Sequence, residues 1–591
     1  MQISYENKKL ERVLIVINAV TSAMVVATFV LLFGFDSPLL STKILYSSQI
    51  ILLCIFISEK ISRCFNCTSK KQFFRNYWFE LPLLIVLLIA SIGAGHWFAT
   101  DSGGASNVRH FAVGIYLVLQ VLIKLCRTSI NLAATGTNPT QTLIASFIVL
   151  ILSGAGILML PTAANGEHIS FIDALFTSTS ATCVTGLVVK DTGTDFSLMG
   201  QIVILTLIQL GGLGIVIFGA VIALLLGQAF SLRESAAMQD LLSAGTLSKI
   251  GNMIAFIFVG TIFVEAIGAV CLYGMWDKAG SHNQLFYSIF HSISAFCNAG
   301  FSLFKNSLIN YNENWQVYLV ICPLIIMGGL GFTVLYDLVI LFGDRTKRIL
   351  KKSFSKQHRF SMEAPKRMLL QTKVVLASSA ILIILGTLGL LLFEKYASTN
   401  ETGNDIGILN AFFQSVTART AGFNTVQIDK LGSSSKFVLI LLMFIGGSPG
   451  STAGGIKTVT LAVILMTLIA TLRKRGDVEI FRRSIRLTVV GRAITVTILF
   501  VVVLFTITLA LSITEHSNGF SFSDIIFESG SALGTVGLST GITSSLTTYG
   551  KLIIIIAMLI GRLGPLTLLA ALTFNIKPAR YNYPEESLIV G

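Results

Sequence analysis

The chain has 591 residues, of which 53% are hydrophobic and only 12% are charged. A soluble globular chain carries roughly 25% charged residues, so this composition excludes a soluble enzyme and favours a membrane protein. The sequence also lacks the G-x-x-x-x-G-K-[ST] loop that cradles ATP phosphates, which excludes an ATP-driven pump. The 43 Lys and Arg against 29 Asp and Glu indicate basic cytoplasmic loops rather than a nucleic-acid partner.

Apolar runs at the start of the chain predict an N-terminal accessory bundle of about four spans in residues 1–140. They lie at roughly 13–34, 43–62, 79–99 and 110–126. The sequence K-I-S-R at 60–63 is faintly similar to a helix of voltage-sensor bundles. A voltage sensor needs several regularly spaced basic residues, but the fourth run and its flanks carry only Arg109, Lys124 and Arg127. We therefore expect an accessory bundle.

Further apolar runs are long enough to span a bilayer, at roughly 141–162, 201–227, 250–274, 316–342, 372–393, 437–472, 493–513 and 551–574. Twelve spans in all place both termini on the same side of the membrane. Two loops are strongly basic, since residues 345–373 carry ten Lys and Arg and residues 473–492 carry seven. Basic loops stay in the cytoplasm, so we predict a plasma-membrane protein with both termini, including the tail 576–591, in the cytoplasm.

The pattern F-x-S-x-[ST]-A occurs four times. Its copies are 114, 123 and 114 residues apart and start at Phe176, Phe290, Phe413 and Phe527. A glycine stands four or five residues after each copy, in the order Gly186, Gly300, Gly422 and Gly537. A second glycine cluster follows 24 to 28 residues later, inside the next apolar run. This internal repeat predicts four units of span, short helix, glycine turn and span, at 141–230, 250–345, 374–475 and 487–575.

The short helix of each unit has about ten residues, half of what a bilayer crossing requires. The loop charges place it on the outer side every time, so it enters and leaves on one face as a re-entrant segment. The helix C-termini would point at a shared centre, where their partial negative charge favours a cation. Glycine lets the next turn aim carbonyls at that centre, and four turns form a ring that can replace a cation's hydration shell. The second glycine clusters serve helix packing equally well.

The segments TSATCVTGL, SAFCNAGFS, TARTAGFNT and GTVGLST closely resemble the filter segments of the Trk/Ktr/HKT superfamily of potassium and sodium uptake proteins. The resemblance implies an all-α polytopic membrane protein, whose four parallel helix–re-entrant loop–helix repeats surround a pseudo-fourfold pore. It also implies potassium uptake, with potassium as substrate and no cofactor bound by this chain. The ion-binding filter residues would be Val184, Thr185, Gly186, Asn298, Ala299, Gly300, Thr420, Ala421, Gly422, Thr535, Val536 and Gly537.

The second span of the third unit is interrupted by five glycines and one proline between Gly446 and Gly455. A glycine costs about 1 kcal/mol and an interior proline about 3 kcal/mol in a helix, so we expect a break that lines a cavity. The run resembles the intramembrane loop that lies below the filter in this family and acts as a gate. The resemblance implies a gate loop over 446–456 and the gate residues Gly446, Gly447, Ser448, Pro449, Gly450, Ser451, Thr452, Gly454, Gly455, Lys457 and Arg562.

Two of these gate residues are basic and lie near the centre of apolar spans, Lys457 after the loop and Arg562 in the fourth unit. A charge at that depth costs at least about 2.5–3.5 kcal/mol, so each should face the bundle interior or water. Arg562 stands where the family carries an arginine that projects into the pore below the filter. There it would repel a waiting potassium ion, and the alternative is a structural pairing with Glu265.

The resemblance further implies a homodimer and a cytoplasmic nucleotide-binding regulatory ring of the RCK type. The ring would dock on the basic loops 346–373 and 473–492, for which contact with anionic lipids of the bilayer is an equally open alternative. A rival function is a sodium-coupled or sodium-permeable secondary cation transporter, such as a symporter. Alternating access predicts inverted repeats and ionisable ligands, whereas these repeats are parallel and the filter residues are uncharged.

Overall fold

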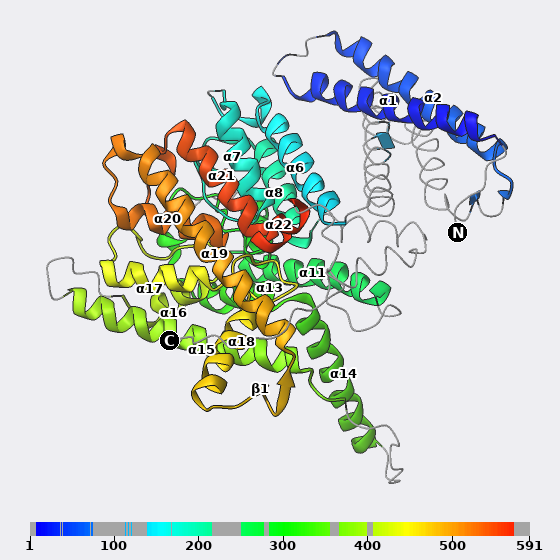
Figure 1. The fold of residues 1–591 in the computed structure, drawn as a ribbon. Helices are drawn as coiled ribbons and strands as arrows, with labels where there is room; N and C mark the ends of the chain where they lie inside the picture. Colours follow the sequence, from blue (N-terminus) through cyan, green and yellow to red (C-terminus); the bar gives the residue numbers. More distant parts are fainter. Residues whose placement is uncertain are drawn as a thin grey trace, which may run out of the picture.

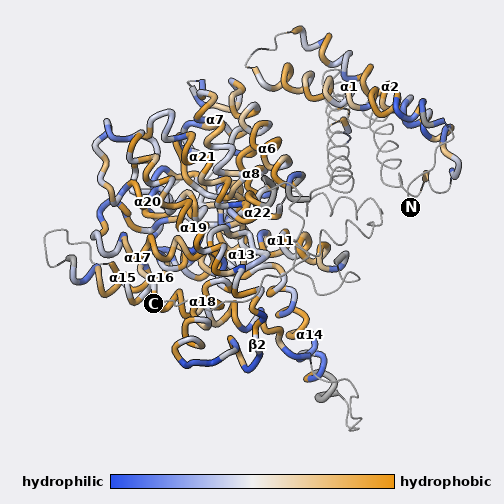
Figure 2. Tube along the Cα trace, in the orientation of Figure 1, coloured by the Kyte–Doolittle hydropathy of each residue, from blue (hydrophilic) through white to orange (hydrophobic). Residues whose placement is uncertain are grey.

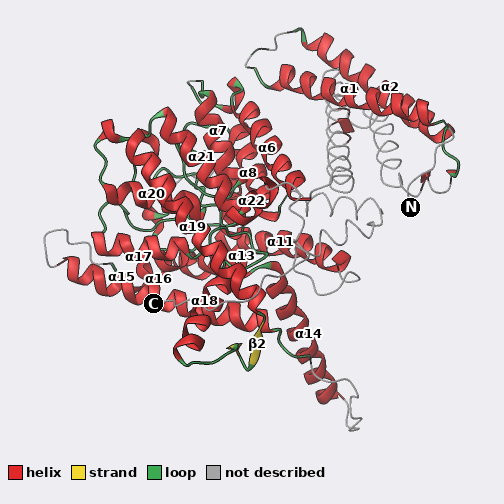
Figure 3. Ribbon diagram, in the orientation of Figure 1, coloured by secondary structure: helices red, strands yellow, loops and turns green. Residues whose placement is uncertain are grey.

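The computed structural model describes residues 7–74, 139–214, 250–276, 283–354, 366–398 and 406–572. Within these ranges it does not describe residues 36, 38, 39, 71, 72 and 167, and outside them it describes residues 113, 116, 117 and 120. Over these ranges the chain is mostly helical, with loops between the helices and one two-stranded hairpin (Figure 3). A mostly helical fold agrees with the predicted all-α class. Several predicted parts lie outside the described residues, namely the span 79–99, most of 110–126, residues 215–227 and the tail 576–591.

Five helices of the described chain are long and apolar enough to cross a membrane. They are α1 (Lys8–Phe33), α2 (Thr42–Phe65), α11 (Ile250–Leu272), α15 (Leu370–Ser398) and α19 (Leu487–Thr514). A sixth candidate span is broken, because its two helical halves meet at an angle of 104°. Apolar residues dominate the helices, whereas hydrophilic residues gather near the hairpin (Figure 2). The chain is thus a membrane protein with several transmembrane helices.

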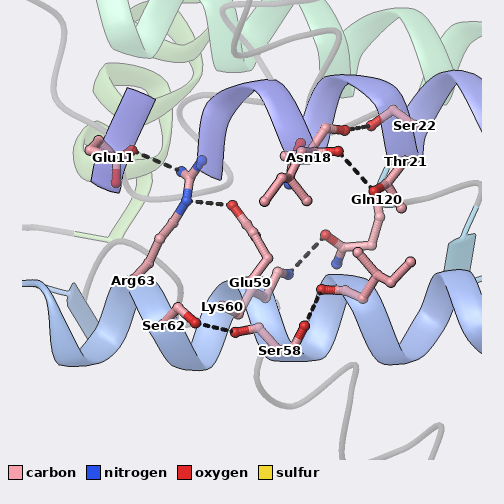
Figure 4. A network of polar contacts seen from close by, with 12 residues as sticks. Glu11, Asn18, Thr21, Ser22, Ser58, Glu59, Lys60, Ser62, Arg63 and Gln120 are labelled. Atoms are coloured by element: carbon pink, nitrogen blue, oxygen red, sulfur yellow. Dashed lines mark hydrogen bonds and ion pairs between the residues drawn. The ribbon is translucent and has the colours of Figure 1, made fainter. Parts of the chain in front are cut away.

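The N-terminal helices α1 and α2 lie side by side (Figure 1). Charged side chains between them are paired, since Arg63 contacts Glu59 and lies 3.6 Å from Glu11 (Figure 4). Lys60 Nζ donates a hydrogen bond of 2.8 Å to Gln120 Oε1. Lys60 and Arg63 of α2 therefore have partners inside this bundle, as a charge away from water requires.

Each predicted repeat contains a short helix of 10 to 13 residues: α7 (Phe171–Thr182), α12 (Gln284–Phe296), α16 (Ile408–Thr417) and α20 (Phe522–Gly534). Serine caps fix where two of them begin. Ser170 Oγ accepts from the Asp173 amide at 3.2 Å, and Ser521 Oγ accepts from the Asp524 amide at 3.3 Å. These bonds satisfy amides that the first turn of a helix leaves free.

The second helix of every repeat ends at or just before the second glycine cluster. These helices are α8 (Leu198–Leu213), α13 (Cys322–Leu330), α17 (Ser433–Phe444) and α21 (Thr548–Leu563). Gly214, Gly331 and Gly564 end three of them with φ of 83°, 89° and 83°, a conformation that glycine adopts without strain. The chain then continues as α14 (Phe332–Phe354), α18 (Thr458–Leu472) and α22 (Pro565–Leu572) in the last three repeats.

The short helices connect the repeats to one another. Each packs against the first helix of its own repeat, which is α6 (Pro139–Leu158) in repeat one. Each also packs against the second helix of the preceding repeat, in the pairs α12 with α8, α16 with α13, α20 with α17, and α7 with α21. The last pair, whose helices α7 and α21 are neighbours in Figure 1, joins the first repeat to the fourth, so the contacts close a ring.

The basic loop 473–492 contains the hairpin of β1 (Val478–Ile480) and β2 (Arg483–Ile485), which pair antiparallel. Its two turn residues, Phe481 and Arg482, have φ of 49° and 61°, as in a type I′ turn. Val478 and Ile480 are buried against α18, whereas the turn is exposed. The hairpin therefore presents an aromatic and basic tip at the junction of α18 and α19.

Candidate functional site: four turn segments and an intramembrane loop

The backbone follows the same path after each short helix, through four turn segments at 184–186, 298–300, 420–422 and 535–537. The first residue of each segment is left-handed: Val184 (φ 57°), Asn298 (59°), Thr420 (75°) and Thr535 (50°). The glycine that ends each segment is left-handed too, with φ between 69° and 94°. Left-handed residues other than glycine are uncommon, so their recurrence at one position marks a shared and constrained geometry.

The four turn segments meet around one centre. A side-chain carbon added to Gly186 would lie 2.5 Å from the carbonyl oxygen of Ala299, and one added to Gly300 would lie 2.8 Å from that of Ala421. In the same way, a side-chain carbon on Gly422 would meet the carbonyl oxygen of Val536, and one on Gly537 would meet that of Thr185. Each segment therefore touches the next and the fourth touches the first, which brings all twelve predicted filter residues together.

The second hydroxyl of each F-x-S-x-[ST]-A motif ties the short helix to its turn segment. In repeats one and four the serine accepts from the turn glycine's amide at 3.1 Å, in the pairs Ser180–Gly186 and Ser531–Gly537. In repeats two and three the hydroxyl donates to the next carbonyl, in the pairs Ser294–Phe301 (2.8 Å) and Thr417–Phe423 (2.7 Å). The motif thus holds its own turn in place.

The first hydroxyl of the motif fastens the short helix to the first helix of its repeat. It donates to a carbonyl there in the pairs Ser178–Ile151 (2.7 Å), Ser292–Glu265 (2.7 Å) and Ser415–Ile383 (2.8 Å). Ser529 of repeat four instead donates to Ile525 of its own helix at 2.8 Å. The fourth short helix is therefore anchored differently from the other three.

The arrangement of the turn segments suits a cation. The C-termini of the four short helices, which carry partial negative charge, all end where the turn segments meet. Within the described ranges, no group of three or more His, Cys, Asp and Glu side chains is placed to hold a metal ion. The ring offers the backbone carbonyl oxygens of Thr185, Ala299, Ala421 and Val536 where neighbouring segments meet.

The loop 445–457 joins α17 to α18 and contains all the predicted gate residues of the third repeat. It fills the bend between α13 and α14. The Ser448 amide donates to the Gly329 carbonyl at 2.9 Å, and the Phe332 amide donates to the Gly450 carbonyl at 2.9 Å. The loop thereby satisfies backbone groups that the broken helix leaves free.

The same loop touches the turn segments. Thr452 Oγ1 donates to the carbonyl of Phe296, the last residue of α12, at 3.4 Å. Gly454 lies against the side chain of Thr535, because a side-chain carbon at Gly454 would collide with it. The loop therefore contacts both the C-terminal end of α12 and the fourth turn segment.

Arg562 fastens this loop to repeat one. Its guanidinium donates to the carbonyls of Thr452 and Gly211, and to that of Gly212 at 3.3 Å. The alternative pairing with Glu265 is absent from the described contacts, and Glu265 instead accepts from Gln209 Nε2 at 3.1 Å. Lys457 Nζ stays within the loop and donates to the Ala453 carbonyl at 2.8 Å.

Polar contacts between neighbouring repeats were not among our predicted site residues. Lys551 Nζ in α21 lies 2.7 Å from Asp173 Oδ1 in α7, and Lys436 Nζ in α17 lies 3.7 Å from Asp524 Oδ1 in α20. The Tyr318 hydroxyl donates to Asn410 Oδ1 at 2.8 Å. The acceptor always stands three residues before the motif phenylalanine, and the donor ten residues before the first glycine of the second cluster. This constant offset could have identified the pairs.

We expect Lys551→Met to lower the free energy of unfolding by about 1–3 kcal/mol, because the largely buried carboxylate of Asp173 loses its partner. Lys436→Met is the matched control. Its ammonium lies farther from Asp524 and makes no hydrogen bond to it, so its loss should cost less. Thermal unfolding of the purified protein in detergent measures both, and equal losses would contradict the prediction.

Comparisons with known proteins agree on one family. A profile of the TrkH family, described as cation transport protein, matches residues 105–581. The Ktr system potassium uptake protein B of Bacillus subtilis is 39% identical over 459 residues, which cover 77% of this chain and 97% of that protein. The potassium/sodium uptake protein NtpJ of Enterococcus hirae is 37% identical, with the same coverage of 77% and 97%.

A solved structure shows a similar fold. The crystal structure of the potassium transporter TrkH from Vibrio parahaemolyticus covers 85% of this chain and 99% of its own, with a TM-score of 0.56 and 19% identity. The family profile spans most of the chain, and the relatives are matched over nearly their whole length. The resemblance found in the glycine turns is confirmed, and this chain belongs to the TrkH family of cation transport proteins.

Proposed function

We propose that this chain is the membrane subunit of a potassium uptake system and that potassium passes inward between its four turn segments. The observation that carries the proposal is the closed ring of segments, in which each glycine touches a carbonyl of the next segment. The names of the Bacillus and Vibrio proteins support potassium as the ion. No step of this passage is an enzymatic reaction.

Backbone oxygens replace the hydration shell of the ion in this proposal. The left-handed residue and the left-handed glycine of each segment turn successive peptide planes in the same way in all four repeats. The short-helix termini add negative potential at the same place. The hydroxyls of the F-x-S-x-[ST]-A motifs hold the segments at a fixed distance from their helices, so the ring is preorganised before the ion arrives.

The loop 446–456 acts as the gate in this proposal. It contacts the end of α12 and the fourth turn segment, and it is held by the broken helix α13–α14 and by Arg562. Opening requires that these hydrogen bonds exchange for others. The membrane potential drives the ion inward, since the chain carries no nucleotide-hydrolysing motif.

A cytoplasmic nucleotide-binding ring of the RCK type regulates a dimer of this chain in the same proposal. The exposed turn of the hairpin 478–485 and the basic loop 346–373 are the surfaces offered to it, with both termini on the cytoplasmic side. Anionic lipid is the competing partner for these basic loops.

A sodium-coupled or sodium-permeable transporter is the second candidate function, which the printed name of the Enterococcus relative favours. It differs in one requirement, because coupled uptake needs a sodium gradient. The purified chain in liposomes separates the two functions. We expect radioactive rubidium, a potassium substitute, to enter under an inside-negative potential without sodium. Uptake that starts only with an inward sodium gradient would favour the second candidate, and no uptake of either ion by well-folded protein would overturn both.

A further inference from the structure

The residue after the starting phenylalanine of each F-x-S-x-[ST]-A motif is different in every repeat. These residues are Thr177, His291, Gln414 and Glu528. All four are buried on the short helices. Their equivalent positions make them directly comparable, and the ion path proposed above does not use their side chains.

In repeats two and four this side chain holds a serine that lies two residues beyond the turn glycine. His291 Nε2 lies 3.0 Å from Ser302 Oγ. Glu528 Oε2 accepts from Ser539 Oγ at 3.0 Å. We call each pair an outer brace, because it joins the short helix to the residues that directly follow the turn segment.

The two outer braces share a core hydrogen-bond scheme, to which repeat four adds Thr543 Oγ1 as a donor to Glu528 and to Ser539. Ser302 Oγ accepts from the amide of Phe304 at 3.1 Å, and Ser539 Oγ accepts from the amide of Gly541 at 2.9 Å, two residues on in both cases. His291 Nδ1 lies 2.8 Å from a carbonyl, which can only accept, so in the neutral ring Nε2 accepts from the serine. Both serines therefore donate to the short helix and accept from their own turn.

Repeats one and three have no outer brace in the described structure. Thr177 Oγ1 donates to the Asp173 carbonyl of its own helix at 2.9 Å. The Gln414 amide has no hydrogen-bond partner among the described residues. The positions equivalent to the serines hold Val188, which has no hydroxyl, and Asn424, whose amide donates to Val426 at 3.1 Å.

The outer braces therefore alternate around the ring. The glycine contacts place repeat two opposite repeat four, so the braced segments face each other across the centre and the unbraced ones do the same. His291 is also enclosed by aromatic rings, with its centroid 4.5 Å from that of Trp276 and 5.3 Å from that of Phe304. A fully satisfied buried polar network in such packing is rigid.

We propose that His291 and Glu528 are positioning residues that fix the outer ends of the second and fourth turn segments and thereby set the preference for potassium over sodium. The inference rests on the proposed function, because it assumes that the turn segments bind the ion. A smaller ion requires the ring to contract. Two rigid segments on opposite sides resist that contraction, while the other two adjust during passage.

Removal of the serine hydroxyls tests the proposal. We expect Ser302→Ala and Ser539→Ala each to lower the ratio of potassium to sodium uptake in liposomes by about fivefold. This factor corresponds to the net free energy of one ordinary hydrogen bond. The double variant should multiply the two effects, since the braces share no residue. Potassium binding should also raise the melting temperature of the purified protein. The potassium concentration that gives half of the maximal rise should increase by a similar factor in each variant, and this measurement needs no transport.

Two controls separate positioning from a general loss of packing. Ser302→Thr keeps a hydroxyl and should restore most of the wild-type ratio. Thr177 is the counterpart of His291 and Glu528 in the unbraced first repeat. Thr177→Val removes its buried hydroxyl and should leave the ratio of potassium to sodium uptake unchanged. If the wild type prefers potassium but both serine variants keep its uptake ratio, the role of the outer braces is overturned and the proposed filter is not. The same conclusion follows if Thr177→Val shifts the ratio as much as the serine variants do. A wild type without potassium preference overturns the proposed filter, and the braces with it.

Discussion

Replacement of Gly186 by serine is expected to lower the ratio of potassium to sodium uptake at least about tenfold, which lies within the roughly 1–3 kcal/mol that overpacking a close-packed site costs. The glycine has φ of 94°, where a residue with a side chain is strained. Its new side-chain carbon would lie 2.5 Å from the Ala299 oxygen and 3.0 Å from the Gly300 α-carbon. The first two turn segments must separate to accept it, so the carbonyl ring loses its fit to potassium. Uptake of both ions into liposomes measures the ratio.

Gly166→Ser is the matched control for this substitution. Gly166 has nearly the same φ, 97°, but a side-chain carbon there would meet no heavy atom within 4 Å. It therefore adds the same backbone strain without crowding a neighbour. We expect lower stability and an unchanged ion preference. A wild-type ratio in Gly186→Ser would contradict the claim that close contact between the segments sets selectivity.

The sequence was sufficient to predict the turn segments because the repeat marks them four times. A phenylalanine, two hydroxyls and a glycine at fixed spacing each have a local physical role. The hydroxyls bond to backbone within the same repeat, as Ser178 and Ser180 do. Local roles of this kind recur with the repeat, so comparison of the four copies shows them. The mostly helical fold follows in the same way from the length of the apolar runs.

Contacts between repeats could not be predicted from the same pattern. Lys551 and Asp173 are 378 residues apart, and only the closure of the ring brings them together. The partners of Arg562 could not be predicted from the sequence either. A buried guanidinium needs acceptors, and Glu265 is a charged candidate in the sequence. The structure supplies backbone carbonyls instead, which the end of α8 and the loop 445–457 leave free and which no residue type identifies. The hairpin 478–485 was missed because its basic residues indicated a loop and its strands have only three residues.

Arg562→Gln is expected to raise the passive flux of potassium through liposomes at least about tenfold, in the absence of any regulatory partner. The substitution removes charged hydrogen bonds that join the loop carbonyl of Thr452 to Gly211 in repeat one, and each such bond is worth about 1.5–3 kcal/mol. It also removes a positive charge that repels an ion waiting in the proposed pore. Both losses favour an open path.

Arg562→Lys separates the two causes. Lysine keeps the charge, but its single ammonium group cannot span two carbonyls as the planar guanidinium does. A flux as low as that of wild type would assign the effect to charge, and a flux as high as that of Arg562→Gln would assign it to the bridge. Lys457→Met is the comparison within the same loop, since Lys457 bonds only to its own loop and its loss should raise the flux less. Unchanged flux in both Arg562 variants would show that neither the charge nor the bridge holds the loop 446–456 closed.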